Sequence, residues 1–141
     1  ASDTGVSYLD LVTFISKHGS DVNADLEELW KRIVFNISIK NTDDHLRNHG
    51  FLLTEKGWKL SPAYDINPNE FGTGLSLNIS ETDNALELEL ALSVHEYFRI
   101  EKINAGIIIK RVMSSVKNWK NVANKIGISN AEQERMRKAF E

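Results

Sequence analysis

A wide apolar stripe in the first third of the chain is the feature that most limits how it can fold. Large apolar residues recur there at the spacing of a helix face: Leu26, Leu29, Trp30, Ile33, Val34 and Ile37. Asn23 precedes the stripe, and an amide side chain at a helix start can accept a hydrogen bond from an unpaired backbone N–H. A stripe of this width predicts a core helix that is buried on most of its surface.

The stripe ends at Ile39, and a polar segment begins immediately. Residues 40–49 read Lys-Asn-Thr-Asp-Asp-His-Leu-Arg-Asn-His, which is rich in acids and in hydrogen-bonding side chains. Loops that are held by a rigid helix often carry catalytic or binding residues. We therefore take residues 40–50 as the first candidate for a functional loop.

The elements around this loop predict a mostly α fold with a small β-hairpin or sheet insertion, which is an α+β class. A first helix begins after Ser7 and ends at residues 17–19 (Lys-His-Gly), where cations meet the negative end of a helix dipole. Two short apolar runs flank residues 55–57 and predict a hairpin, and the alternation over residues 75–79 predicts one more short strand.

Most of residues 87–140 is predicted to be helical. The apolar spacing favours one helix over about 87–98 and a longer one over about 100–126. Residues 129–132 (Ser-Asn-Ala-Glu) match a capping box, in which the serine and glutamate side chains bond to backbone N–H groups of the same turn. A last helix is therefore expected to begin after Ser129.

Composition argues against several functional classes. The chain has 141 residues, 41% of them hydrophobic and 26% charged, which suits one globular domain with its own core. A formal net charge of −3 lacks the basic excess of most nucleic-acid-binding domains. With no cysteine, thiol chemistry and thiolate metal sites are excluded. No apolar run approaches the roughly 18 residues of a membrane span and no signal peptide is visible, so we expect a cytoplasmic protein.

Three polar residues stand at spacings that suit phosphoryl transfer. Asn48 follows Asp43 by five positions, and Asp65 stands seventeen beyond Asn48. Protein kinases use a carboxylate beside the attacking hydroxyl, an asparagine five residues later, and a further aspartate on a second loop, because the phosphates need Mg²⁺. The spacing alone leaves another interpretation open, since Asp and Asn in loops also form turns and helix caps.

Two longer strings carry a family resemblance. Residues 35–51 (Phe-Asn-Ile-Ser-Ile-Lys-Asn-Thr-Asp-Asp-His-Leu-Arg-Asn-His-Gly-Phe) resemble the catalytic loop of HipA-family kinases, with its Thr-Asp-x-His-x-Lys/Arg-Asn core. Residues 60–66 (Leu-Ser-Pro-Ala-Tyr-Asp-Ile) resemble the second signature of that family, Leu-x-Pro-x-Tyr-Asp. The two strings occur in the family's order, and the similarity extends from about Ser7 to Ser129.

The resemblance implies a C-terminal lobe of a HipA-type protein serine/threonine kinase that uses Mg²⁺ and ATP. It assigns Asp43 as the catalytic base or hydroxyl-orienting carboxylate. Asn48 and Asp65 are implied to hold Mg²⁺ and to complete the catalytic set.

The resemblance also suggests supporting roles. His45 is expected to shape the loop, and Arg47 to approach a phosphate or a backbone carbonyl of the loop. Asp44 occupies a variable position of the motif, so we expect it to be solvated or to act as a cap.

These implications define a domain plan. Residues 1–6 are expected to be a linker or boundary, and residues 7–141 to form the kinase lobe. Within the lobe lie the catalytic loop at 40–50, a metal-binding loop at 61–68, and the C-terminal helices at 87–140.

HipA kinases are longer chains whose N-terminal lobe supplies the phosphate-covering loop and the ATP-anchoring lysine. Nothing before Asp43 resembles that lobe, so we expect this chain to belong to a longer protein and to be inactive alone. The residues that contact ATP cannot be identified in this lobe from its sequence.

Partners also follow from the resemblance, because HipA kinases are toxins of bacterial toxin–antitoxin pairs. The expected partners are a HipB-like DNA-binding antitoxin, a protein substrate and the missing N-terminal lobe. DNA is expected to be contacted through the antitoxin rather than by this lobe, and no membrane contact is expected.

Two alternatives stay open. His45 and His49 stand four apart beside two aspartates, a spacing that suits a metallohydrolase if the segment is helical. The apolar positions after Leu86 also suit a non-catalytic helical module that docks a partner such as the antitoxin and retains a degenerate kinase site.

Overall fold

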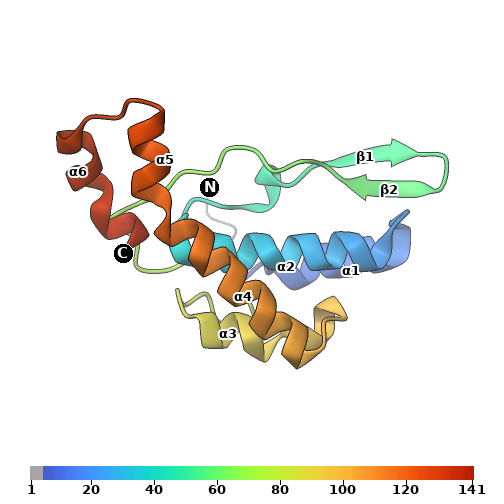
Figure 1. The fold of residues 1–141 in the computed structure, drawn as a ribbon. Coiled ribbons are helices and arrows are strands. Elements are labelled where there is room, and N and C mark those ends of the chain that lie inside the picture. Colours follow the sequence, from blue (N-terminus) through green and yellow to red (C-terminus); the bar gives the residue numbers. More distant parts are fainter. Residues whose placement is uncertain (1–4) are drawn as a thin grey trace.

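A computed structural model of the chain describes residues 5–141, so the predicted linker lies largely outside the described residues, at positions 1–4. The described chain is mostly helical with a two-stranded antiparallel sheet, which confirms the α+β class (Figure 1). In chain order the elements are α1 (Tyr8–His18), α2 (Val22–Ile39), the 3₁₀ helix η1 (Leu46–Asn48), β1 (Phe51–Thr54), β2 (Gly57–Leu60), α3 (Leu88–Ser93), the 3₁₀ helix η2 (His95–Phe98), α4 (Lys102–Lys117), α5 (Trp119–Lys125) and α6 (Asn130–Phe140).

The central element is α2, which lies alongside α1 and is crossed by α4 (Figure 1). Its predicted stripe is buried, and five of its residues have no exposed surface: Leu26, Leu29, Trp30, Ile33 and Val34. The Trp30 indole N–H donates to the carbonyl of Ala91 at 2.9 Å, so the one polar atom of this ring is satisfied and ties α2 to α3. The sequence prediction of a buried core helix is therefore confirmed.

Both ends of α1 follow the sequence pattern. The Ser7 hydroxyl accepts from the Leu9 N–H at 3.0 Å, and the Asp10 carboxylate accepts from the Ser7 N–H at 2.9 Å. The start of α2 differs from the prediction, because the helix begins at Val22 and Asn23 lies inside it. The Ser20 N–H donates to the Trp58 carbonyl of the hairpin at 2.9 Å, so Ser20 lies outside the helix. The Asp21 carbonyl accepts the first helical bond, from the Asp25 N–H at 3.0 Å, which makes Asp21 the residue where the chain enters the helix.

The predicted hairpin is present, with β1 and β2 paired from Phe51 opposite Leu60 to Thr54 opposite Gly57. Gly57 has a φ of 131°, and a Cβ at this position would lie 2.7 Å from the His18 carbonyl oxygen, so only glycine fits. The base of the hairpin packs on α1, where the rings of Phe14 and Phe51 lie 4.7 Å apart. The hairpin itself projects beyond the helices (Figure 1).

The predicted strand at residues 75–79 is wrong as a sheet strand. The alternation is real, because Leu75, Leu77 and Ile79 are buried. Instead of joining a ladder, the segment forms a single parallel bridge, in which Tyr8 N–H donates to Asn78 O at 2.9 Å. The segment therefore seals the core beside the start of α1 without extending the sheet.

The C-terminal helices are shorter than predicted. The 87–98 region divides into α3 and η2, and the 100–126 region divides at Asn118 into α4 and α5. The predicted capping box is present, since the Ser129 hydroxyl accepts from the Glu132 N–H at 3.3 Å. The Trp119 and Phe140 rings stack with centroids 4.8 Å apart and join α5 to α6. Among the helices of residues 5–141, none combines the length and the apolar character that crossing a bilayer requires.

Candidate active site

The loop that follows α2 is held against the end of that helix. Lys40 adopts a left-handed conformation with a φ of 55°, and the Asn41 N–H turns back to donate to the Asn36 carbonyl at 2.9 Å. Asn41 is 1% exposed, and its side-chain amide donates to Asn36 Oδ1 at 3.0 Å. The loop is therefore anchored where it begins, at the polar end of the apolar stripe.

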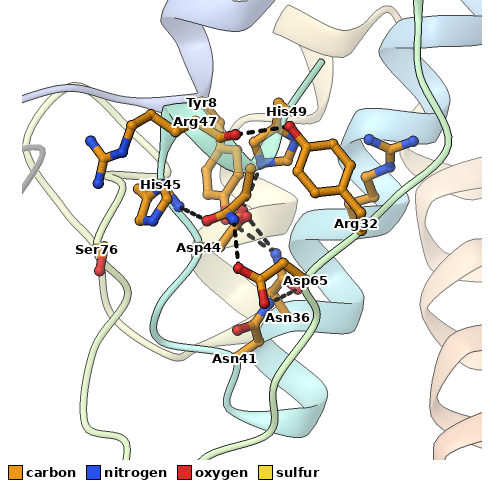
Figure 2. Close-up of polar contacts among 12 residues, drawn as sticks. Tyr8, Arg32, Asn36, Asn41, Asp44, His45, Arg47, His49, Asp65 and Ser76 are labelled. Atoms are coloured by element: carbon orange, nitrogen blue, oxygen red, sulfur yellow. Dashed lines mark hydrogen bonds and ion pairs between the residues drawn. The ribbon is translucent and has the colours of Figure 1, made fainter.

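Asp44 points into the protein and is 4% exposed, so the expectation that it is solvated or a cap is wrong. Its Oδ2 accepts hydrogen bonds from the Tyr8 hydroxyl and from Asn36 Nδ2, the latter at 3.1 Å. The same oxygen lies 2.8 Å from His49 Nε2, as Figure 2 shows. A buried carboxylate must have donors around it, and here α1, α2 and the end of the loop each supply one.

Tyr8 is the donor from α1. Burial, together with the charge and hydrogen bond of Asp44, raises the pKa of the Tyr8 phenol well above its ordinary value of 10.0. The phenol therefore keeps its proton at neutral pH and remains a donor to the Asp44 carboxylate. Asn36 donates to the Tyr8 oxygen at 3.2 Å, which closes a three-membered polar cluster inside the core.

Asn48 is the residue at which the two predicted signatures meet. It lies in η1 and is 6% exposed. Its Oδ1 accepts from the His45 backbone N–H at 3.1 Å, and this bond sets the orientation of the amide. Its Nδ2 then donates to Asp65 Oδ2 at 3.1 Å, across a sequence separation of seventeen residues.

Asp65 reaches this position because the hairpin returns the chain. The Ser61 N–H donates to the Gly50 carbonyl at 2.8 Å, just beyond the last pair of the sheet. Asp65 itself is exposed and has a left-handed φ of 55°, a conformation that Asp tolerates better than most residues. The Asp65 Oδ1 also accepts from Asn67 Nδ2 at 2.8 Å. Backbone geometry and two amide donors thus fix the direction of this carboxylate.

Asp43, the residue assigned to the acceptor hydroxyl, lies on the outer side of the loop. Its side chain is exposed, and among residues 5–141 it forms no hydrogen bond or ion pair. The structure therefore brings Asn48 and Asp65 into contact and leaves Asp43 on open surface, one residue before the buried Asp44.

The two supporting residues contribute through the backbone. His45 holds Asn48 through its N–H, while its own ring Nδ1 is buried without a hydrogen-bond partner among the described residues. The Arg47 carbonyl accepts from the Tyr64 hydroxyl at 2.8 Å, which joins the first loop to the second. Figure 2 shows the Arg47 side chain extending away from Asp65.

A cavity of about 440 Å³ opens behind the loop, between α2, α4 and residues 63–66. One wall carries the polar residues of the loop and of α2: Asn36, Asp44, Asn48 and His49. Arg32 lines another part, where its Nη2 donates to the Ser61 carbonyl at 2.6 Å. Asn48 therefore faces this cavity on one side and Asp65 on the other. Asp43 and Asp65 themselves do not line the cavity.

The donor set at Asn48 and Asp65 fits a magnesium ion better than a transition metal. Within residues 5–141 no group of three or more His, Cys, Asp or Glu residues is placed to hold a metal. Mg²⁺ needs fewer protein ligands, because it keeps waters and binds substrate phosphates together with one or two carboxylates. Asp65 supplies a carboxylate, and Asn48 Oδ1 keeps a second lone pair beside its bond to His45.

The same geometry gives no support to a metallohydrolase. His45 and His49 flank a 3₁₀ helix of three residues, so they do not share an α-helical face. His49 Nε2 is already engaged by Asp44, and the buried Nδ1 of each ring has no hydrogen-bond partner among the described residues. The two imidazoles therefore do not form a metal site.

Sequence reasoning missed the cluster around Asp44. Tyr8 was not singled out, because a tyrosine at a helix start has many ordinary roles, and His49 was considered only as a metal ligand together with His45. One signal was available at Asn36, a polar residue one turn from the end of a buried helix. A buried amide must be paired, so Asn36 predicts a polar partner nearby.

Comparison with known proteins agrees with the two signatures. A Haemophilus influenzae protein named "Putative kinase" is 36% identical over 62 residues, which cover 43% of this chain and 18% of that protein. The chain thus spans only a small part of that relative. Residues 1–140 match the family model described as HipA-like C-terminal domain. Because the match covers nearly the whole sequence, the chain belongs to the HipA-like C-terminal domain family.

Proposed function

We propose that the chain is the catalytic-loop domain of a HipA-like protein serine/threonine kinase and occupies the place of a kinase C-terminal lobe. The observation that supports the proposal most is the 3.1 Å contact between Asn48 and Asp65. These residues belong to the two signature segments, and phosphoryl transfer requires metal ligands from both loops at one point. The fold supplies that meeting point through the hairpin between them.

We assign each residue a role that its position supports. Asp43 is exposed and orients or deprotonates the hydroxyl of a protein substrate. Asn48 and Asp65 hold Mg²⁺, which neutralises charge on the phosphates of ATP when both are bound. The rest of the loop contributes positioning, with His45 holding the Asn48 amide by its backbone N–H.

Arg47 and Tyr64 support the second loop. The Tyr64 hydroxyl holds the Arg47 carbonyl, so the Asp65 segment and η1 are joined by two bonds rather than by the Asn48 contact alone. The Arg47 guanidinium is exposed, and we assign it to a phosphate or to a backbone carbonyl of the loop.

The complete kinase needs parts that this lobe does not supply. An N-terminal lobe covers the ATP phosphates, and a HipB-like antitoxin restrains the kinase as in a toxin–antitoxin pair in the cytoplasm. The surface that faces these partners carries Asp43 and the exposed segment 62–67. DNA is reached through the antitoxin, in keeping with the net charge of −3.

The test is phosphoryl transfer by the full-length parent protein. Asp43→Asn and Asp65→Asn are each expected to lower phosphate incorporation by about a hundredfold or more, since acid–base and electrostatic groups contribute on this scale. Asp21→Asn is the matched control, because Asp21 is an exposed helix cap where asparagine serves equally well. Wild-type turnover in both loop variants would contradict the catalytic assignment.

A second candidate function is a non-catalytic module that docks the antitoxin. One observation favours it: an apolar groove of about 380 Å³ between α4, α5 and α6, where Val122 and Ile126 are exposed. Under this alternative, Val122→Asp would abolish antitoxin binding while the Asp43→Asn and Asp65→Asn variants of the parent protein would behave as wild type in every assay.

A further inference from the structure

Asp44 is the buried titratable group that the proposed chemistry does not use. Its neighbour Asp43 is exposed and accessible to a substrate, whereas Asp44 is 4% exposed. Burying a carboxylate is costly unless donors replace the lost water, so this arrangement requires a compensating structure. That structure is the set of donors that converges on one oxygen, Asp44 Oδ2.

The donors come from three separate parts of the fold. Tyr8 lies in the first turn of α1, Asn36 in the last turns of α2, and His49 at the far end of the loop (Figure 2). Asp44 therefore fastens the middle of the loop to two core helices and to the residue where the loop ends. The Asn36 side chain serves twice, because its Oδ1 also accepts from Asn41 at the beginning of the loop.

Asn48 lies in the short segment between Asp44 and His49, whose side chains contact each other. The contact between Asp44 and His49 brackets η1, and Asn48 is the residue directly before His49. Within the bracket, the His45 N–H orients the Asn48 amide so that Nδ2 faces Asp65. Any movement of Asp44 or His49 must displace Asn48, since only a few residues separate them.

We infer that Asp44 is a positioning residue whose buried carboxylate, held by Tyr8, Asn36 and His49, fixes the loop so that Asn48 meets Asp65. It touches neither substrate nor metal and acts through η1. Its effect on phosphoryl transfer rests on the proposed function, while its effect on the contact of Asn48 with Asp65 does not.

Asp44→Asn is the sharpest substitution, because it keeps the size of the side chain and removes only the charge and one acceptor. All three donors bond to Oδ2, and the amide oxygen of asparagine can take that place only without the negative charge, so each of these hydrogen bonds becomes weaker. Asp21→Asn makes the same chemical change at an exposed cap and serves as the matched control.

The first measurement uses the isotope-labelled chain and Mn²⁺ as a stand-in for Mg²⁺. Broadening of the Asn48 side-chain amide resonances reports the metal at the loop, and the concentration dependence gives its affinity. Asp44→Asn is expected to lower that affinity about 10- to 100-fold, the usual effect of removing a group that orients metal ligands. Asp21→Asn is expected to match the wild type.

Tyr8→Phe is the second variant, because it removes one donor and leaves the Asp44 charge in place. It guards against the case in which Asp44→Asn fails to fold, which circular dichroism would reveal. A smaller loss of Mn²⁺ affinity, in the same direction, is expected from Tyr8→Phe. A folded Asp44→Asn or Tyr8→Phe chain with wild-type Mn²⁺ affinity and unshifted Asn48 resonances would overturn the inference.

The second measurement separates this role from catalysis. In the full-length parent, Asp44→Asn is expected to raise the Mg²⁺ concentration needed for half-maximal phosphorylation about 10- to 100-fold, and saturating Mg²⁺ should restore much of kcat. Asp43→Asn should instead lower kcat at every Mg²⁺ concentration.

If the parent shows no phosphoryl transfer at all, the proposed function fails, and the Mn²⁺ titration still decides the role of Asp44. A loss of kcat by Asp44→Asn that Mg²⁺ does not relieve would contradict a positioning role.

Discussion

The two loops that meet at Asn48 and Asp65 are supported in different ways. Residues 41–49 are tied into the core: Asn41, Asp44 and Asn48 are buried, Asn41 bonds to α2, and Asp44 bonds to both α1 and α2. Residues 62–67 are all exposed, and they are held chiefly by the contacts of Tyr64 and Asp65 with the first loop. The second loop thus takes its position from the first. Damage to the first loop should spread to the second, while damage to the second should stay local.

The largest expected effect is a loss in the free energy of unfolding of the chain when the buried carboxylate of the first loop is removed. Asp44→Ala leaves the Tyr8, Asn36 and His49 donors without their shared acceptor, and breaking a buried charged network typically costs about 3–5 kcal/mol. Asp43→Ala changes an exposed side chain and should alter the free energy of unfolding by less than about 0.5 kcal/mol.

Urea denaturation of these two neighbouring variants measures the difference directly. Equal free energies of unfolding for Asp43→Ala and Asp44→Ala would show that the buried cluster does not support the fold.

An intermediate effect is expected from Tyr8→Phe, which removes a hydrogen bond to a charged group and should cost about 1.5–3 kcal/mol. The cost should depend on pH. Because the pKa of the Tyr8 phenol is raised in the folded state, its stabilisation is complete below about pH 10 and is lost as the pH rises through the higher folded value.

The pH dependence of urea denaturation provides the check. The difference in unfolding free energy between wild type and Tyr8→Phe should be constant from pH 7 to 9 and shrink above pH 10. A difference that stays constant into the alkaline range would mean that the phenol does not retain its proton through burial beside Asp44.

The smallest expected effect concerns the second loop. Tyr64→Phe removes an exposed hydrogen bond to the Arg47 carbonyl and should lower global stability by less than about 1 kcal/mol. Amide hydrogen exchange should nevertheless accelerate in residues 62–67, because that hydrogen bond is one of their few attachments. Faster exchange in residues 41–49 as well would contradict the one-way dependence of the second loop on the first.

Local spacing predicted those parts of the fold that depend on neighbouring residues. The stripe from Leu26 to Ile37 predicted the core helix, the Ser129 capping box predicted the last helix, and residues 55–57 predicted the hairpin. Each of these patterns is set by contacts within a few residues. The prediction failed at residues 75–79, where the bonding partner is the segment before α1 and no local pattern reveals it.

The orientation of the two adjacent aspartates could not be predicted from neighbouring residues either, because it also depends on partners that are distant in the sequence. Asp43 and Asp44 are adjacent and chemically identical, and which one turns inward depends on the left-handed Lys40 and on Tyr8, thirty-six residues before Asp44. The family motif placed Asp43 at the acceptor hydroxyl but gave Asp44 no role. Long-range donors decide such positions, and only the folded chain shows them.

The most direct test of the central claim, that Asn48 and Asp65 together form a metal-binding site, is a Mn²⁺ titration of the isotope-labelled chain with and without Asp65→Asn. We predict that the Asn48 side-chain amide and the backbone amides beside Asp65 broaden first in the wild type, and that Asp65→Asn abolishes this broadening. Broadening that begins elsewhere, or that survives Asp65→Asn unchanged, would contradict the account.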